Sequence, residues 1–219
     1  MGIVNLTDDS YYAPSRCLCD NPVETSMQRI RRLIEEGADI IDIGACSTRP
    51  GSVPVGADAE WERIAPVLEA VCVEFPELRI SIDTYHSSVI VRAYEMMASR
   101  LGVERTTGQL IVNDISAGED DSLMLPEVGR LGLTYVVMHK RGDSMTMQSL
   151  CDYDDVVSRV REYFEDFALK ARKYGIKDWI IDPGLALQRL WIRITSFLLL
   201  LIRYRYSADP FWSESLVRV

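Results

Sequence analysis

Polar side chains stand at the ends of short apolar runs along this chain, and they are the first candidates for chemistry. Carboxylates and amides can pair with the N–H groups of a heterocycle, bind a metal ion or act as general bases. The residue types alone leave these three uses open. For any single residue, capping of the following helix explains the pattern equally well, but it explains the whole set poorly. The set comprises Asn5, Asp42, Asp83, Asn113 with Asp114, His139 and Asp182.

Two further segments offer groups that could bind phosphate or metal. Hydroxyl groups beside Arg49 in the segment 44–51 suit an oxyanion or phosphate, with an ordinary turn as the alternative. The segment 5–10 offers hard oxygen ligands that suit Mg²⁺ shared with a phosphate substrate, or else an Asx turn or helix cap. The two histidines, His86 and His139, are expected to be packed or exposed rather than catalytic.

The elements that would position these residues follow from the hydrophobic pattern. Apolar residues at helical spacing predict helices, and Gly37 ends the first of them. Near-continuous apolar runs between the helices predict strands that are roughly 25–45 residues apart, which leaves room for a helix between each pair. Such an order predicts a parallel sheet covered by helices. The predicted helices span 23–36, 61–71, 89–97, 121–130 and 156–171, and the predicted strands span 2–4, 38–43, 79–82, 110–112, 135–138 and 179–181.

Two α/β architectures fit this order of elements, an open doubly wound sheet and a (β/α)8 barrel. A barrel places its active site at the carboxyl ends of many strands, whereas a doubly wound sheet concentrates it at one switch point. Polar residues end most of the predicted strands, and no G-x-G-x-x-G motif opens a helix. The barrel is therefore the favoured architecture.

Composition excludes several classes of protein. The 219 residues carry 24 Lys and Arg against 33 Asp and Glu, a net charge of −9, which disfavours nonspecific binding to nucleic acid or to an anionic membrane. The apolar run 197–202 is far shorter than the ~20 residues of a spanning helix. Five scattered cysteines do not form a disulfide pattern, so we expect reduced thiols and a cytoplasmic location.

The motifs resemble those of dihydropteroate synthase, an enzyme of the folate pathway. Residues 1–10 read M-G-I-V-N-L-T-D-D-S, against the family's M-G-I-L-N-V-T-P-D-S. Matches to five further signatures of the family follow in the same order and spacing, and together they cover residues 1–186. These matches lie at 37–44 with 47–51, at 80–84, at 112–118, at 137–139 with Gly142 and Met145, and at 181–184.

The resemblance implies a barrel of the TIM type and a specific reaction. The enzyme condenses 6-hydroxymethyl-7,8-dihydropterin pyrophosphate with p-aminobenzoate to give 7,8-dihydropteroate and pyrophosphate, with Mg²⁺ as cofactor. These small molecules would be the partners, together with a second copy of the chain in a homodimer. The implied pterin-binding residues are Asp83, Asn113, Ile115, Met138 and Asp182; the implied metal ligand is Asn5; the implied catalytic residues are Thr48, Arg49 and Asp9.

The sequence departs from the family pattern after Ala186. The family continues with F-x-K-T and later carries S-R-K-S and R-x-H on its seventh and eighth strands, whereas this chain continues L-Q-R-L-W-I-R-I. The neighbouring codon frame permits F-A-K-T and, near the end, S-R-K-S, which indicates a frameshift near Ala186. We therefore predict a partial pterin-binding barrel domain at 1–186, with about six βα units and strands seven and eight missing or replaced, and a non-family tail at 187–219.

An unclosed barrel of this kind would leave strand edges unpaired, so we expect the chain to aggregate. Two alternatives to an active synthase stay open, a catalytically inactive relic with residual pterin binding and a pterin-binding methyltransferase domain. The segment 47–51, together with Asn5 and Thr7, favours the synthase over the methyltransferase.

Overall fold

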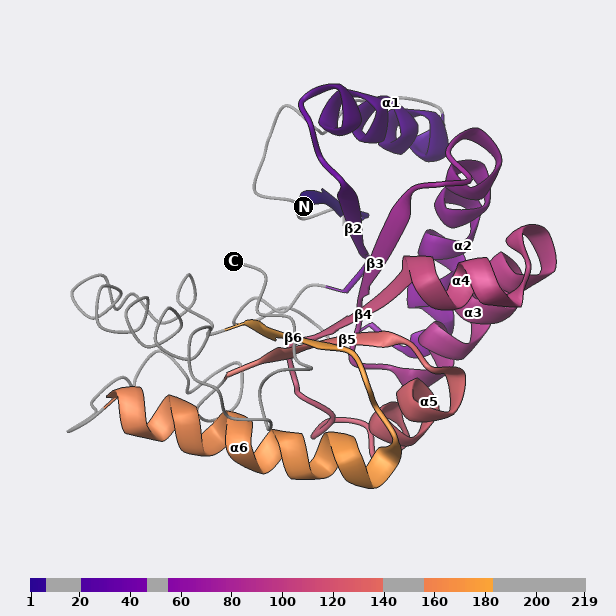
Figure 1. Cartoon of the computed structure of the whole chain (residues 1–219). Helices are drawn as coiled ribbons and strands as arrows, with labels where there is room; N and C mark the ends of the chain where they lie inside the picture. Colours follow the sequence, from indigo (N-terminus) through magenta and orange to yellow (C-terminus); the bar gives the residue numbers. More distant parts are fainter. Residues whose placement is uncertain (7–20, 47–54, 140–155, 183–219) are drawn as a thin grey trace. The chain divides into compact units, whose positions relative to one another are not determined.

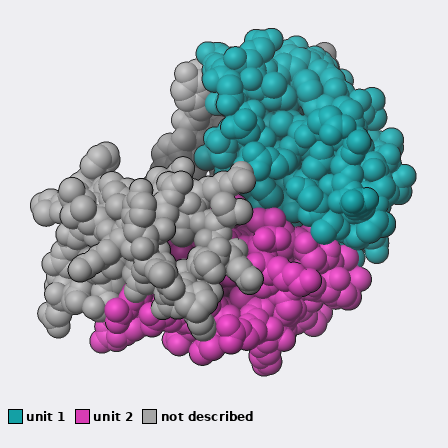
Figure 2. All heavy atoms as spheres, viewed as in Figure 1, with its two compact units in different colours: residues 1–113 teal, residues 114–219 magenta. Residues whose placement is uncertain are grey.

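The computed structural model of the chain describes residues 1–6, 21–46, 55–139 and 156–182. The chain divides into two compact units, Met1–Asn113 and Asp114–Val219, which Figure 2 shows in different colours. Among the described residues, no helix is long and apolar enough to cross a membrane.

Unit 1 alternates strands and helices, as the hydrophobic pattern predicts. Its strands are parallel and hydrogen-bonded in chain order, and its helices lie against them (Figure 1). The last strand, β4, ends at Asp114, the first residue of unit 2. The elements are β1 (Gly2–Asn5), α1 (Pro22–Glu35), β2 (Ile40–Gly44), α2 (Ala57–Glu74), β3 (Arg79–Asp83), α3 (Ser87–Leu101), α4 (Val103–Gln109) and β4 (Leu110–Asp114).

Unit 2 contains a parallel pair of strands with a long helix between them in the chain. Its elements are α5 (Met124–Leu131), β5 (Thr134–Met138), α6 (Val156–Tyr174) and β6 (Trp179–Asp182). Tyr135 stacks on Phe167 with ring centroids 5.6 Å apart, and Phe167 meets Trp179 edge-on at 5.3 Å. These three rings are buried, so aromatic packing joins α6 to both strands.

The first helix, α1, begins and ends at residues suited to helix termini. The Asn21 side chain accepts hydrogen bonds from the backbone N–H groups of Val23 and Glu24, and Pro22 occupies the first turn. Gly37 has a φ of +96°, a conformation that glycine adopts without strain. The predicted helix end at Gly37 is therefore confirmed.

The strands of unit 1 turn one set of alternate side chains toward the helices. A Cβ atom at Gly2 would lie 3.0 Å from Leu33 Cδ1, so glycine lets α1 pack closely on β1. By strand alternation, the register partners of Gly2 face the same way, and they are buried: Ile41, Ile80 and Leu110. The opposite face carries four polar residues of β2, β3 and β4, namely Asp42, Ser81, Asp83 and Asn113.

Two sequence-based expectations differ from the structure of unit 1. Asp42 was expected at a strand end, but β2 continues to Gly44, and Asp42 is only 4% exposed. The strand continues because the Asp42 carboxylate accepts a hydrogen bond from the Asn113 amide, so the buried position is satisfied. The short helix α4 was not predicted, because it has a single large apolar residue, Val103, which is exposed.

Candidate active site

Four residues at the carboxyl ends of β1 to β4 are neighbours across the sheet of unit 1. Asn5 pairs in register with Gly44, Gly44 with Asp83, and Asp83 with Asn113. Residues in register project from the same face of a parallel sheet, here the face opposite Gly2 and Leu33. The predicted site residues Asn5, Asp83 and Asn113 therefore lie in one row.

Gly44 lets its neighbours in this row approach closely. A Cβ atom at Gly44 would lie 3.3 Å from Asp83 Oδ2 and 3.6 Å from Asn5 Oδ1. The two side chains thus lie close to one point above Gly44, where no side chain of β2 intervenes. Glycine at this position therefore lets oxygens of Asp83 and Asn5 gather at the carboxyl ends of neighbouring strands.

The Asn113 amide is oriented by a buried carboxylate. Its Nδ2 donates to Asp42 Oδ1 at 3.2 Å, which leaves the amide oxygen of Asn113 to accept. Burial raises the pKa of Asp42, and the hydrogen bond from Asn113 opposes that rise. Asp83 and Asn113 are both half-buried, so their acceptor oxygens can meet N–H donors of a ligand away from bulk water.

Two predicted residues of unit 2 are also neighbours. Met138 and Asp182 are register partners at the carboxyl ends of β5 and β6. The backbone N–H of His139 donates to the Asp182 carbonyl at 2.8 Å, and the Tyr163 hydroxyl donates to the Met138 carbonyl at 3.1 Å. These bonds fix both strand ends. Alternation places the two side chains on the face opposite Tyr135, which packs on α6.

His139 is packed rather than placed in the row of ligand-facing residues. It is 4% exposed, and its ring meets the Tyr163 ring edge-on with centroids 4.9 Å apart. Burial lowers the pKa of His139 to about 4. The expectation of a packed histidine is confirmed here.

Ile115 follows β4 directly and is half-buried, on a loop that Asp114 holds. The other three predicted residues, Asp9, Thr48 and Arg49, lie outside the described residues. The family-like positions Gly142 and Met145 and the predicted tail 187–219 also lie outside them. In the part of the chain that the structure describes, no cluster of three or more His, Cys, Asp or Glu side chains could hold a metal ion.

Sequence reasoning missed a buried pair beside β3. Glu60 in α2 is fully buried, and its Oε2 lies 2.6 Å from His86 Nδ1. Its other oxygen, Oε1, has no hydrogen-bond partner among the described residues. Burial raises the pKa of Glu60, and the His86 and Thr84 side chains offset part of that rise. The available signal was the spacing of Glu60 and Ile64, which share one face of a helix.

Helix α2 also contacts the segments that directly follow β2 and β3. Arg63 Nη1 donates to the Ala45 carbonyl at 3.1 Å, directly after β2. Cys46 Sγ lies 3.3 Å from the Tyr85 hydroxyl, which links the segments that follow the two strands. Together with the Glu60–His86 pair, these contacts fix the backbone on either side of Gly44 and Asp83.

Comparison with known proteins places these features in a family. The family model described as pterin binding enzyme matches residues 1–190. The mitochondrial folate synthesis bifunctional protein of Arabidopsis thaliana is 38% identical over 195 residues, which cover 86% of this chain and 33% of that protein. The dihydropteroate synthase of Escherichia coli strain K12 is 33% identical over 186 residues, which cover 84% of this chain and 60% of that protein. The resemblance found in the motifs is confirmed.

Solved structures show the same likeness. A Yersinia pestis dihydropteroate synthase in a sulfonamide drug complex superposes with a TM-score of 0.71 at 30% identity, over 84% of this chain and 62% of that one. A Xanthomonas albilineans dihydropteroate synthase with 4-aminobenzoic acid gives a TM-score of 0.66 at 33% identity, over 84% and 60%. The predicted fold class, an incomplete (β/α)8 barrel type, is confirmed. The chain spans about three fifths of the length of these solved relatives.

Proposed function

Because the chain belongs to the pterin binding enzyme family, we propose that it acts as a dihydropteroate synthase. The observation that carries this proposal is the row of Asn5, Gly44, Asp83 and Asn113, which gathers acceptor oxygens at the carboxyl ends of neighbouring strands. A pterin ring presents amino and ring N–H groups along one edge. Carboxylate and amide oxygens are the acceptors that match such donors in plane.

We assign the pterin contacts to five residues that match the family motifs. Asp83, Asn113 and Asp182 accept hydrogen bonds from the pterin, and Ile115 and Met138 contact its ring. Supporting this assignment, Met138 and Asp182 share a register position and a sheet face, and the Asn113 amide oxygen is oriented by the bond to Asp42.

The reaction exchanges one bond at the pterin methylene carbon. The amine nitrogen of p-aminobenzoate forms a C–N bond to that carbon, the C–O bond to pyrophosphate breaks, and its electron pair leaves with pyrophosphate. The amine then loses a proton. Positive charge develops on the pterin as the C–O bond lengthens, and the carboxylates of Asp83 and Asp182 stabilise it.

Asn5 is the proposed protein ligand of Mg²⁺. Its amide oxygen is a hard donor, and Mg²⁺ characteristically takes few protein ligands and completes its shell with water and substrate phosphates. The Asn5 amide oxygen lies at the carboxyl end of β1, near the Asp83 carboxylate, and is the one protein oxygen that we assign to the metal. When bound, Mg²⁺ stabilises negative charge on the leaving pyrophosphate.

The remaining roles follow from the family motifs. We propose that Thr48 and Arg49 act near the phosphate and aminobenzoate, and that Asp9 contributes from the first loop. One solved relative is described with 4-aminobenzoic acid and another with 7,8-dihydropteroate. A cytoplasmic homodimer is part of the same proposal.

The second candidate is a pterin-binding protein without synthase activity. The departure from the family pattern after Ala186 favours it, because residues 187–194 read L-Q-R-L-W-I-R-I where the family continues with F-x-K-T. We propose that residues 1–186 form the pterin-binding domain and that a frameshift produced residues 187–219. Sequencing the DNA on both sides of the Ala186 codon tests this; a reading with no one-base change that restores the family frame contradicts it.

A product assay separates the two candidates. The purified full chain is incubated with the dihydropterin pyrophosphate, p-aminobenzoate and Mg²⁺, and dihydropteroate is measured by mass spectrometry. Product that disappears in the Asp83→Ala variant supports the synthase. Pterin binding without product supports the second candidate, and the absence of both contradicts the assignment of the site.

A further inference from the structure

A buried carboxylate holds the loop that follows β4. Asp114 is fully buried, and three groups donate to it. Its Oδ1 accepts from the Ser116 N–H at 2.7 Å, and its Oδ2 accepts from the Gly118 N–H at 2.9 Å and from the Tyr135 hydroxyl at 2.8 Å. Both oxygens are therefore used, and two of the three bonds go to the backbone of the loop itself.

This loop is strained at Ala117. Ala117 has a φ of +54° and Gly118 a φ of +77°, and Ala117 is the one non-glycine residue with positive φ in the part of the chain that the structure describes. For an L-residue with a Cβ this conformation costs roughly 1–2 kcal/mol. Such backbone persists only where neighbouring groups over-determine it. The two backbone bonds to Asp114 lie on either side of Ala117 and supply that restraint.

Gly118 is required by its surroundings. A Cβ atom at this position would lie 2.7 Å from Leu125 Cγ, which is too close for any side chain. Ser116 adds a further restraint, because its Oγ accepts a hydrogen bond from the Asp120 N–H at 3.3 Å. Hydrogen bonds and close packing therefore restrain the backbone of the loop from Ser116 to Asp120.

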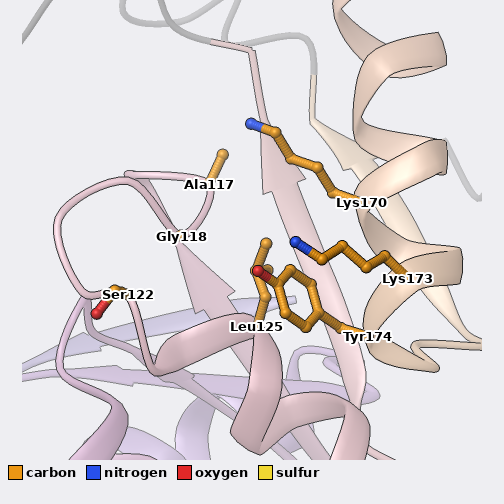
Figure 3. A pocket seen from close by; sticks show the side chains of 7 residues that line it. All are labelled: Ala117, Gly118, Ser122, Leu125, Lys170, Lys173 and Tyr174. Carbon is orange, nitrogen blue, oxygen red and sulfur yellow. The ribbon is translucent and has the colours of Figure 1, made fainter.

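Packing on the side of α6 does not close over the loop. A pocket adjoins it there, and Figure 3 shows Lys170 and Lys173 extending from α6 toward the segment that carries Ala117 and Gly118. Because this side of the loop is open, the hydrogen bonds to Asp114 carry more of the restraint. The third bond connects the carboxylate to Tyr135, whose ring stacks on Phe167 in the core of unit 2.

We infer that Asp114 is a positioning residue for ligand binding: it fixes the strained loop 115–118 and so holds the Ile115 side chain in the position that contacts the pterin. Ile115 lies between Asp114 and Ser116, so its backbone is enclosed by the first of the two loop bonds. This role rests on the proposed function, because the pterin is the ligand that Ile115 contacts. Fixing a contact residue before binding reduces the entropy lost on binding.

The test compares affinity and stability in three variants of the full chain. A pterin is titrated into wild type, Ala117→Gly, Asp114→Asn and Tyr135→Phe, and thermal unfolding is measured for each. Ala117→Gly should weaken binding about threefold or more without lowering Tm, because glycine relaxes the strain but loosens the loop. Asp114→Asn should weaken binding, since a carboxamide replaces one acceptor by a donor.

Tyr135→Phe is the matched control. It removes the bond to the core but keeps both bonds to the loop, so Tm should fall while pterin affinity stays within about twofold of wild type. Affinities of Ala117→Gly and Asp114→Asn equal to wild type would overturn the positioning role alone. Absence of pterin binding by the wild type would overturn the proposed function, and the positioning role with it.

Discussion

Glu60 in unit 1 and Asp114 in unit 2 are both fully buried, yet their oxygens are satisfied differently. Asp114 accepts three hydrogen bonds, from Ser116, Gly118 and Tyr135. Glu60 has one contact within hydrogen-bond distance, to His86, and its Oε1 has no partner among the described residues. Burial raises the pKa of both carboxyl groups. The two carboxylates are therefore equally buried but differ in the number of hydrogen bonds that depend on them.

The difference concerns what is left behind when the carboxylate is removed. Without Asp114, two buried donors and one part-buried donor lose their acceptor. An unsatisfied buried donor costs more than a made bond gains. Without the charge on Glu60, only one partner changes its bond, and the cost of burying that charge disappears. Asp114 is thus a fixed part of the loop structure, whereas Glu60 is a charged group whose neutral form is favoured by its surroundings.

Removal of Asp114 should produce the largest loss of stability. Asp114→Ala leaves the Ser116 and Gly118 N–H groups and the Tyr135 hydroxyl without an acceptor, so we expect the free energy of unfolding to fall by about 3 kcal/mol or more. Urea denaturation measures this change. Glu95→Ala, at an exposed carboxylate in α3, is the control and should change little. A loss below about 1 kcal/mol for Asp114→Ala would show that the three bonds do not matter.

The two histidines extend the contrast, because His86 faces a carboxylate and His139 packs against the rings of Tyr163 and Phe164. Burial lowers the pKa of His139 from 6.5 to about 4, so the unfolded chain binds this proton more readily than the folded chain. Stability should therefore fall as the pH drops from about 6.5 to about 4, by at most about 3 kcal/mol. Urea denaturation across this range should show a shallower pH dependence for His139→Gln than for wild type. If stability depends on pH equally in the variant and the wild type, protonation of His139 is not the cause of that dependence.

Glu60→Gln should change stability by about 1 kcal/mol or less, and in the stabilising direction at pH values above the raised pKa of Glu60. The sign follows from linkage. The pKa of Glu60 is higher in the folded chain than in the unfolded chain, where it is near 4.5. The wild type therefore loses stability as the pH rises from about 4.5 through the raised pKa of the folded chain. The advantage of the variant should shrink as the pH falls. A destabilisation as large as that of Asp114→Ala would abolish the distinction between the two carboxylates.

The smallest effect is expected at an exposed carboxylate. Glu74 in α2 bonds Arg31 of α1, with Nε and Oε1 2.6 Å apart, and this bond lowers the pKa of Glu74. Both side chains are more than a third exposed, so solvent and salt screen the pair. Glu74→Gln should lower Tm slightly, by less than the change in Tm that either Asp114→Ala or Glu60→Gln produces, and added salt should remove the difference between this variant and the wild type. A salt-independent fall in Tm would show that this helix–helix contact is more than a surface pair.

The fold was largely predictable because the strands are nearly continuous apolar runs. Gly37 marked the end of α1, and the polar residues predicted at strand ends include Asn5, Asp83 and Asn113, which the structure places in one row. Periodicity does not register a charged residue at a buried helix position, so the Glu60–His86 pair was missed. Asp42 was misplaced because a partner 71 positions away in the chain, Asn113, makes its burial possible.

Other features of the site had no signal in a single sequence. The close approach of the Asn5 and Asp83 side chains at Gly44 depends on the register of three strands. The restraint on Ala117 depends on a left-handed backbone, which an alanine in the sequence does not indicate. Both arise from tertiary geometry. Asp9, Thr48 and Arg49 stay predictions from the family motifs.

Equilibrium titration of the full chain with 6-hydroxymethyl-7,8-dihydropterin tests the central claim most directly, because it needs neither turnover nor the second substrate. We predict saturable binding with one site per chain, greatly weakened in Asp83→Asn and Asn113→Ala. Asp39→Asn, at an exposed carboxylate just before β2, should bind as wild type does. Binding that is absent from the wild type, or that is indifferent to Asp83 and Asn113, would contradict the assignment of the strand ends as the pterin site.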